Sequence, residues 1–171
     1  MARKFDRSGA FTVYFLRNEN GRVYAGKTCA LPRRLKQHNG ELSGGARYTR
    51  GRGPWRPVAT VTGFETDIQA LQAEWRLRKA LRKARSPCAA IAKACRDLLG
   101  RGYGWTRSSP RPDDQALCVA VASSEMAASA GFDLSLVPEH WAFHVVDDPG
   151  DPEAFLPYGP DAFFPGGKEG L

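Results

Sequence analysis

The alternation of apolar and polar positions predicts three short strands in the first third of the chain. Residues 11–16 are aromatic and β-branched, which is typical of a strand. The turn-forming residues 18–21 separate this segment from a second predicted strand at residues 22–25, so the two are expected to form a β-hairpin. Residues 55–61 have the same character and predict a third strand.

A short helix and a glycine-rich loop are predicted between the second and third strands. Pro32 suits the first turn of a helix and the Asn-Gly pair at residues 39–40 suits its end, which places the helix over residues 31–38. Residues 40–53 contain five glycines and four large side chains, Arg47, Tyr48, Arg50 and Arg52. This composition predicts a flexible basic loop.

A longer helix that carries one unexpected carboxylate is predicted after the third strand. Thr66 or Asp67 would cap it, and it runs to about residue 85. At 100° per residue, its apolar side is formed by Ile68, Ala70, Leu71, Trp75 and Leu77. Glu74 falls on this apolar side, where a carboxylate is costly unless it is paired or binds a metal. An i,i+4 ion pair with Arg78 is the structural alternative.

The second half of the chain shows weaker signals. A second helix is predicted over residues 89–99, strands at residues 116–122 and 141–146, and an irregular tail from residue 147 onward. The fold class expected from these elements is α/β, more specifically α+β. It consists of a small three-stranded antiparallel sheet flanked by helices and a C-terminal region of uncertain fold.

The charge of the chain changes sign near residue 110. Residues 1–110 hold 23 Lys and Arg against 7 Asp and Glu, a net charge of +16. Residues 111–171 hold 2 against 11, a net charge of −9. This division favours a first region that meets phosphates and a second region that does not. An Arg-rich solvated face is the alternative explanation. We therefore predict three parts: residues 1–85, a helix and linker at 86–110, and an acidic C-terminal region at 111–171.

The sequence favours an intracellular protein in a reducing compartment, either cytoplasmic or nuclear. No segment approaches the roughly 20 apolar residues of a membrane span, and the N-terminus lacks the apolar run of a secretory signal. The cysteines are scattered without a C-x-x-C pair, at Cys29, Cys88, Cys95 and Cys118. This spacing argues against a disulfide framework and against a zinc ribbon or RING module.

A series of short motifs resembles one nuclease family. Residues 13–15 (Val-Tyr-Phe) and 24–26 (Tyr-Ala-Gly) resemble the paired tripeptides of the GIY-YIG nuclease superfamily, at that family's short spacing. Further segments resemble motifs of that family and occur in the same order as in the family, at residues 24–28, 31–39, 44–49, 53–55, 63–64 and 70–75. Over residues 11–85 the series is most similar to the catalytic subunit of the eukaryotic structure-specific endonuclease and its small bacterial relatives. Residues 1–85 are thus expected to form a GIY-YIG-like nuclease domain.

The resemblance implies a catalytic site with one divalent cation. Glu74 would be the protein ligand of a single Mg²⁺ or Mn²⁺ ion, with waters and phosphate completing the coordination shell. Arg34 would stabilise the charge on the phosphoryl oxygens. The helical spacing agrees, because Arg34 lies beside the apolar stripe of residues 31 and 35 whereas Arg33 points away.

Two tyrosines and a histidine complete the implied site. Tyr14 would activate or orient the attacking water, and Tyr24 and His38 would position the phosphate or relay a proton. A phenol is a weak base at neutral pH, but a nearby cation lowers its pKa, and Lys27 matches a lysine found in parts of the superfamily.

Structural alternatives exist for the aromatic side chains and the histidine. Tyr14 and Tyr24 could be a cross-strand aromatic pair, and His38 could be a cation at a helix C-terminus. Trp55 and Trp75 are expected in the core rather than as base-stacking surfaces.

Five basic residues are expected to contact the nucleic-acid backbone: Arg33, Lys36, Arg47, Arg50 and Arg52. Neither a helix-turn-helix nor a zinc finger is recognisable, which favours recognition of DNA shape. His140 and His144 have helical spacing but lie in a strand-like segment without obvious partner ligands, which disfavours a zinc site.

The function expected from the sequence is hydrolysis of branched or flapped DNA by a structure-selective endonuclease in repair or recombination. The rival from another class is a catalytically silent nucleic-acid-binding module that keeps the fold. A subunit that is active only with a scaffold protein is a third possibility. Within the nuclease class, a restriction or homing enzyme is the alternative.

Overall fold

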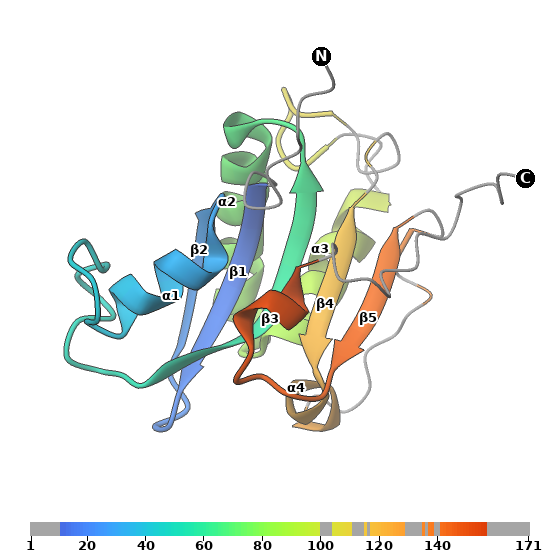
Figure 1. Cartoon of the computed structure of the whole chain (residues 1–171). Coiled ribbons are helices and arrows are strands. Elements are labelled where there is room, and N and C mark those ends of the chain that lie inside the picture. Colours follow the sequence, from blue (N-terminus) through green and yellow to red (C-terminus); the bar gives the residue numbers. More distant parts are fainter. Residues whose placement is uncertain are drawn as a thin grey trace, which may run out of the picture.

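A five-stranded mixed sheet forms the centre of the fold (Figure 1). The computed structural model describes residues 11–99, 104–110, 115, 117–128, 135, 137–138 and 141–156. The strands, in the order β2-β1-β3-β4-β5 across the sheet, are β2 (Val23–Thr28), β1 (Phe11–Asn18), β3 (Trp55–Phe64), β4 (Cys118–Ala122) and β5 (Ala142–Val146). All neighbours pair antiparallel except β4 and β5, which are parallel.

The predicted three-stranded sheet is therefore extended by two strands from the C-terminal part of the chain. Both added strands were expected as strands, but their place in the sheet was not. Short apolar segments indicate strands without indicating which neighbour they pair with, so periodicity alone could not extend the sheet. Every residue of β4 is buried, as is typical of a strand covered on both faces. After β5, the segment expected to be irregular contains the short 3₁₀ helix η3 (Pro152–Phe155).

The helices cover the two faces of the sheet unequally. Helices α2 (Asp67–Ala84) and α3 (Pro87–Leu99) pack on one face, whereas α1 (Leu31–His38) and η3 pack on the other (Figure 1). The side chain of Thr66 accepts a hydrogen bond from the backbone N–H of Gln69 at 3.2 Å, so Thr66 is the N-cap of α2. The predicted helices are confirmed to within two residues at each end.

Alternation along β1 sends successive side chains to these two faces. Val13 and Phe15 join the core beneath α2 and α3, and Tyr14 and Leu16 join the smaller cluster beneath α1 and η3. The smaller cluster also contains Trp55, as expected for a core tryptophan. On the face beneath α1, the polar groups of side chains from the β1–β2 hairpin and from α1 therefore meet.

The orientation of α2 differs from the one predicted. Three large apolar side chains expected in the core are exposed: Ile68 (67%), Leu71 (51%) and Trp75 (54%). The buried side consists of Ala70, Ala73, Leu77 and Ala80. Small alanines let the helix approach the sheet and α3 closely, and an 18-residue helix with apolar side chains on two sides cannot bury both. The placement of Trp75 in the core was wrong for this reason.

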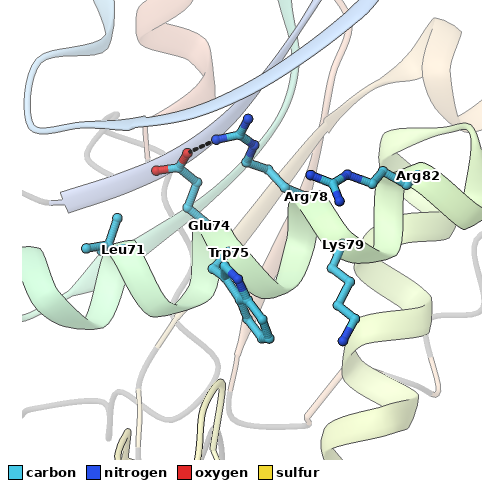
Figure 2. Close-up of a pocket in the computed structure, with 6 residues that line it drawn as sticks. All are labelled: Leu71, Glu74, Trp75, Arg78, Lys79 and Arg82. Atoms are coloured by element: carbon cyan, nitrogen blue, oxygen red, sulfur yellow. Dashed lines mark hydrogen bonds and ion pairs between the residues drawn. The ribbon is translucent and has the colours of Figure 1, made fainter.

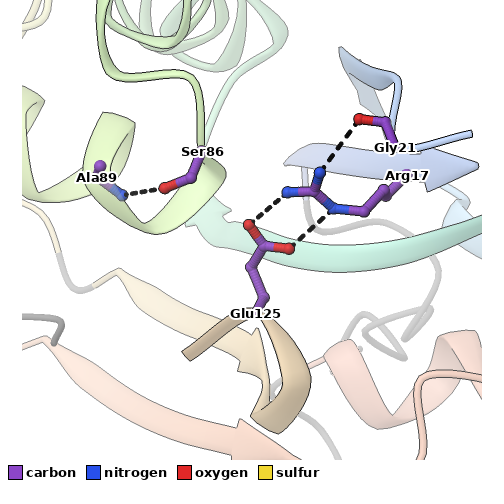
Figure 3. A network of polar contacts seen from close by, with 5 residues as sticks. All are labelled: Arg17, Gly21, Ser86, Ala89 and Glu125. Atoms are coloured by element: carbon purple, nitrogen blue, oxygen red, sulfur yellow. Dashed lines mark hydrogen bonds and ion pairs between the residues drawn. The ribbon is translucent and has the colours of Figure 1, made fainter. Parts of the chain in front are cut away.

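A bidentate ion pair ties the C-terminal part of the chain to the first hairpin (Figure 3). Arg17 on β1 donates from Nε and Nη2 to the two carboxylate oxygens of Glu125, at 3.0 and 2.6 Å. Glu125 belongs to α4 (Ser123–Ala128), directly after β4, and only 4% of its side chain is exposed. Arg17 also donates to the carbonyl of Gly21, so it braces the hairpin turn as well.

Removal of this carboxylate is expected to destabilise the whole fold. Glu125→Ala leaves the guanidinium of Arg17, which is 24% exposed, without its main partner. We expect the free energy of unfolding in urea to fall by about 2–3 kcal/mol. Glu153→Ala, which removes an exposed carboxylate, should change it by less than about 0.5 kcal/mol. Equal effects of the two substitutions would show that the ion pair does not hold the C-terminal strands to the hairpin.

Candidate active site

Tyr14, Tyr24, Arg34 and His38 converge on the α1 side of the β1–β2 hairpin. In the strand register Tyr14 lies opposite Gly26, and Leu16 lies opposite Tyr24, so the two tyrosines are diagonal neighbours on one face. Their ring centroids are 6.3 Å apart, and that of His38 is 4.9 Å from that of Tyr24. A Cβ atom on Gly26 would lie 2.6 Å from the Tyr14 hydroxyl, which explains why a glycine stands there.

A chain of buried hydrogen bonds fixes the histidine. The hydroxyl of Thr49 donates to the carbonyl of Ala46 at 3.0 Å, so its oxygen accepts from Nδ1–H of His38 at 2.7 Å. Nε2 of His38 therefore carries a lone pair, and it accepts a hydrogen bond from the Tyr14 hydroxyl at 2.8 Å. The arrangement sets one tautomer of His38 and directs the phenol proton of Tyr14 toward it.

Arg34 also forms a hydrogen bond with the Tyr14 hydroxyl. Its Nε donates to the Tyr14 oxygen at 3.3 Å, and Nη1 donates to Gln37 and to the carbonyl of Gly44 at 2.9 and 3.0 Å. These bonds orient the guanidinium across the end of the hairpin. Arg33 is exposed, as the helical spacing predicted.

The electrostatics of the cluster keep both Tyr14 and His38 neutral. Burial is the main cause that raises the pKa of Tyr14 well above its ordinary value, and Tyr24 and Glu74 add to it while Arg34 opposes it. Burial, and secondly the charge of Arg34, lower the pKa of His38 to about 4. A neutral His38, only 3% exposed, is not the helix-terminal cation considered as the alternative.

The lowered pKa of His38 predicts a specific pH dependence. The unfolded chain takes up the proton first as the pH falls, because its histidine has a pKa of about 6.5. The stability that neutral His38 contributes is thus fully present above about pH 6.5 and is lost as the pH falls toward 4. In an NMR titration, we expect His38 to keep its proton on Nδ1 alone down to about pH 5. Protonation with a midpoint near 6.5 would contradict the buried hydrogen-bond chain.

Glu74 reaches the same region from the other side of the sheet. Only 12% of its side chain is exposed, and Nη1 of Arg78 donates to its Oε1 at 3.2 Å (Figure 2). The i,i+4 pair considered from the sequence is therefore present. Within the described residues this bond reaches only Oε1, which leaves Oε2 available as a ligand. Glu74 is close enough to Tyr14 to raise the pKa of that phenol.

The stretch of chain that holds these residues matches a family model. Residues 10–86 match the model described as the GIY-YIG catalytic domain. Residues 10–86 form a GIY-YIG catalytic domain. The resemblance that the motifs predicted is thereby confirmed, and the α+β fold agrees with it.

Several curated relatives that match this stretch are named structure-specific endonuclease subunit SLX1. The human protein is 46% identical over 69 residues, which are 39% of this chain and 25% of the human protein. The Xenopus laevis protein is 49% identical over 72 residues, 39% of this chain and 26% of that protein. The Neurospora crassa protein is 39% identical over 98 residues, which are 55% of this chain and 24% of that protein. The chain spans about a quarter of the length of these relatives.

One predicted residue does not join the cluster of the GIY-YIG domain. Lys27 lies opposite Val13 in the register, so its side chain is on the α2 face, away from the tyrosines. There it forms an ion pair with Asp67 in the first turn of α2. Lys27 therefore connects β2 to α2, and the structure does not support its predicted action on a tyrosine.

Three residues of the GIY-YIG domain were missed as parts of the site. Thr49 holds the histidine tautomer, and Tyr48 stacks on Tyr24 with centroids 6.0 Å apart and an interplanar angle of 22°. Asn39 exchanges two hydrogen bonds with the backbone of Trp55, at 2.7 and 3.0 Å, and so fixes the end of α1 next to β3. A hydroxyl and an aromatic ring within an otherwise glycine-rich basic loop were the available signal for the first two.

The predicted backbone contacts of the GIY-YIG domain are all at the surface. Arg33, Lys36, Arg47, Arg50 and Arg52 are exposed, and Arg52 lies 5.0 Å from the ring centroid of Tyr48. They rim the α1 side of the sheet with positive charge.

The described part of the chain carries no multidentate metal site. Within it, no three His, Cys, Asp or Glu side chains gather around a common point. The four cysteines are free, as expected, and His144 bonds to the carbonyl of Ala154 and contacts Cys118, while His140 lies outside the described residues. None of the described helices has the length and apolar character needed to cross a membrane.

Proposed function

We propose that this chain is a structure-selective DNA endonuclease that hydrolyses phosphodiester bonds in branched or flapped DNA, in repair or recombination. The observation that carries the proposal is the hydrogen-bonded row Arg34–Tyr14–His38 inside a GIY-YIG domain, with Glu74 within electrostatic reach. The choice of branched DNA rests on the relatives, which are named structure-specific endonuclease subunits.

Glu74 is proposed to hold one Mg²⁺ or Mn²⁺ ion. A single, partly buried carboxylate with one available oxygen fits a hard cation that keeps most of its ligands as waters and phosphate oxygens. Such an ion, when bound, neutralises charge that develops on the scissile phosphate. Arg78 is half exposed, at 52%, and can leave the carboxylate for solvent or for the DNA backbone.

Tyr14 and His38 are proposed to relay the proton of the attacking water. The Tyr14 oxygen accepts that proton while its own proton moves to Nε2 of His38, along the hydrogen bond of 2.8 Å. The phenol never has to exist as an isolated phenolate, which its raised pKa makes costly. The relay thereby avoids a free phenolate, and the proton ends on the imidazole of His38.

Arg34 is proposed to bind the non-bridging oxygens of the phosphate and Tyr24 to position it. The guanidinium is already oriented by Gln37 and by the carbonyl of Gly44, so little reorganisation is needed when negative charge develops. Arg33, Lys36, Arg47, Arg50 and Arg52 are proposed to hold the DNA backbone without reading sequence.

The test is cleavage of labelled four-way junction, flap and plain duplex DNA by the purified chain with Mg²⁺ or Mn²⁺. Metal-dependent cuts near the branch, with the plain duplex left intact, are the expected result. Equal cutting of the duplex would contradict the proposed substrate class. Tight, salt-sensitive binding without cutting would contradict activity of the chain alone and favour a silent binding module or a requirement for a scaffold protein. Addition of a candidate scaffold would separate those two.

A further inference from the structure

The exposed side of α2 carries a feature that the proposed chemistry does not use. A shallow hollow of about 380 Å³ runs along the helix and is lined by Leu71, Glu74, Trp75, Arg78, Lys79 and Arg82. Trp75 is the largest apolar side chain in it and is 54% exposed. Figure 2 shows Glu74 and Arg78 on one side of the helix, toward the N-terminal strands, and Trp75 on the side away from them.

We propose that this hollow binds an unpaired stretch of DNA next to the cleavage site, with a base stacked on the indole of Trp75. The inference rests on the proposed function, because it assigns a place to the single-stranded arm of a flapped or branched substrate. Lys79 and Arg82 bind the phosphates on either side of the stacked base.

The indole of Trp75 is exposed to solvent rather than packed in the core. Its ring lies 5.8 Å from the guanidinium carbon of Arg76, whose Nε donates to the carbonyl of Trp105 at 3.1 Å. This hydrogen bond holds the guanidinium next to the ring. Nζ of Lys79 lies 5.2 Å from the same ring centroid. Lys79 is exposed, so its ammonium group can leave the ring and bind a phosphate instead.

Charge selects the occupant of the hollow. Its lining has three cationic side chains and one carboxylate, and that carboxylate is the proposed metal ligand. An apolar protein surface would have to desolvate these charges, whereas a nucleotide supplies a phosphate for the cations and a ring for the indole. A duplex keeps its base faces stacked internally, so only unpaired nucleotides can use Trp75.

The hollow also includes the proposed metal ligand, Glu74. Glu74 and Trp75 both line the hollow, so a strand bound there lies beside the carboxylate. The stacked base would be next to the scissile phosphate, on the unpaired side of the branch. Stacking tolerates any base, which agrees with recognition of DNA shape rather than sequence.

Tryptophan fluorescence tests the inference without metal or cleavage. The other three tryptophans, Trp55, Trp105 and Trp141, are 2%, 1% and 3% exposed, so quenching by added DNA reports Trp75. With the full chain in EDTA, an oligothymidylate of about eight nucleotides is expected to quench the fluorescence, and a hairpin duplex is not. Trp75→Ala should abolish the quenching and weaken oligothymidylate binding, followed by anisotropy, on the order of tenfold.

Matched variants separate stacking from general effects. Trp75→Phe keeps an aromatic face and should bind within roughly threefold of the unchanged chain. Ile68→Ala removes an exposed apolar side chain of the same helix outside the hollow and should change nothing. Lys79→Gln should weaken binding and reduce its salt dependence, whereas Arg96→Gln, on the exposed surface of α3, should do so less.

Several outcomes would overturn the inference. One is oligothymidylate affinity that is unchanged in Trp75→Ala, and another is a hairpin duplex that quenches as well as the single strand. Self-association that is lost in Trp75→Ala, without quenching by DNA, would assign the hollow to a protein surface instead. Cleavage that depends on Glu74 without any quenching refutes the stacking site alone. Quenching without cleavage leaves the stacking site standing and contradicts nuclease activity of the chain alone.

Discussion

Glu74→Gln is expected to lower the rate of flap or junction cleavage by at least about 1,000-fold, because it removes the negative charge proposed to hold the cation. Glutamine keeps the size of the side chain and an acceptor for Arg78, so the fold and the i,i+4 contact should persist. The measurement is single-turnover cleavage in Mg²⁺ and in Mn²⁺, with binding of the same substrate followed in EDTA.

Glu65→Gln is the matched control. Glu65 is exposed and stands just before the same helix, so neutralising it should change the rate by less than about twofold. DNA affinity should stay equal in all three proteins. A Glu74→Gln protein that still cuts within tenfold of the unchanged chain would remove Glu74 from the proposed metal site.

Arg34→Lys is the second substitution for which we expect a large loss, of about 100- to 1,000-fold in kcat. The guanidinium holds Tyr14, Gln37 and the carbonyl of Gly44 at once, through Nε and Nη1. A lysine has the same charge but presents a single donor group, so it cannot hold Tyr14 and a phosphate together. Loss of kcat with little change in KM is the expected signature in steady-state kinetics.

Arg33→Lys separates geometry from charge. Arg33 is the neighbour on the same helix, but it is exposed and was assigned to the DNA backbone. Its replacement should leave kcat within about twofold and affect only binding. If Arg34→Lys also kept kcat within about twofold, positive charge on α1 would be sufficient and the orientation of Arg34 would be irrelevant.

The sequence was sufficient for the site elements because local signals agree there. The hairpin has a turn between two β-branched strands, and α1 has a proline at its start and Asn39-Gly40 at its end. The separation of Arg34 from Arg33 followed from helical spacing. The roles of Glu74 and of the tyrosines remain predictions that the experiments above address.

What the sequence could not supply depends on partners distant in the chain. Thr49 acts through His38, and their hydrogen bond requires a loop conformation that no periodicity indicates. The side of α2 that is buried was misjudged because large apolar residues dominate a helical wheel, whereas the sheet and α3 accept the small alanines. Pairing of β4 with β3 joins segments more than fifty residues apart.

That last pairing has a practical consequence for any fragment cut at the boundary of the family match. A chain that stops at residue 86 would leave the edge of β3 open at residues 59–62, which pair with β4, and would remove the carboxylate that binds Arg17. An open, apolar strand edge is a template for aggregation. Expression of the nuclease domain therefore requires the C-terminal strands β4 and β5, which cover this edge of its sheet.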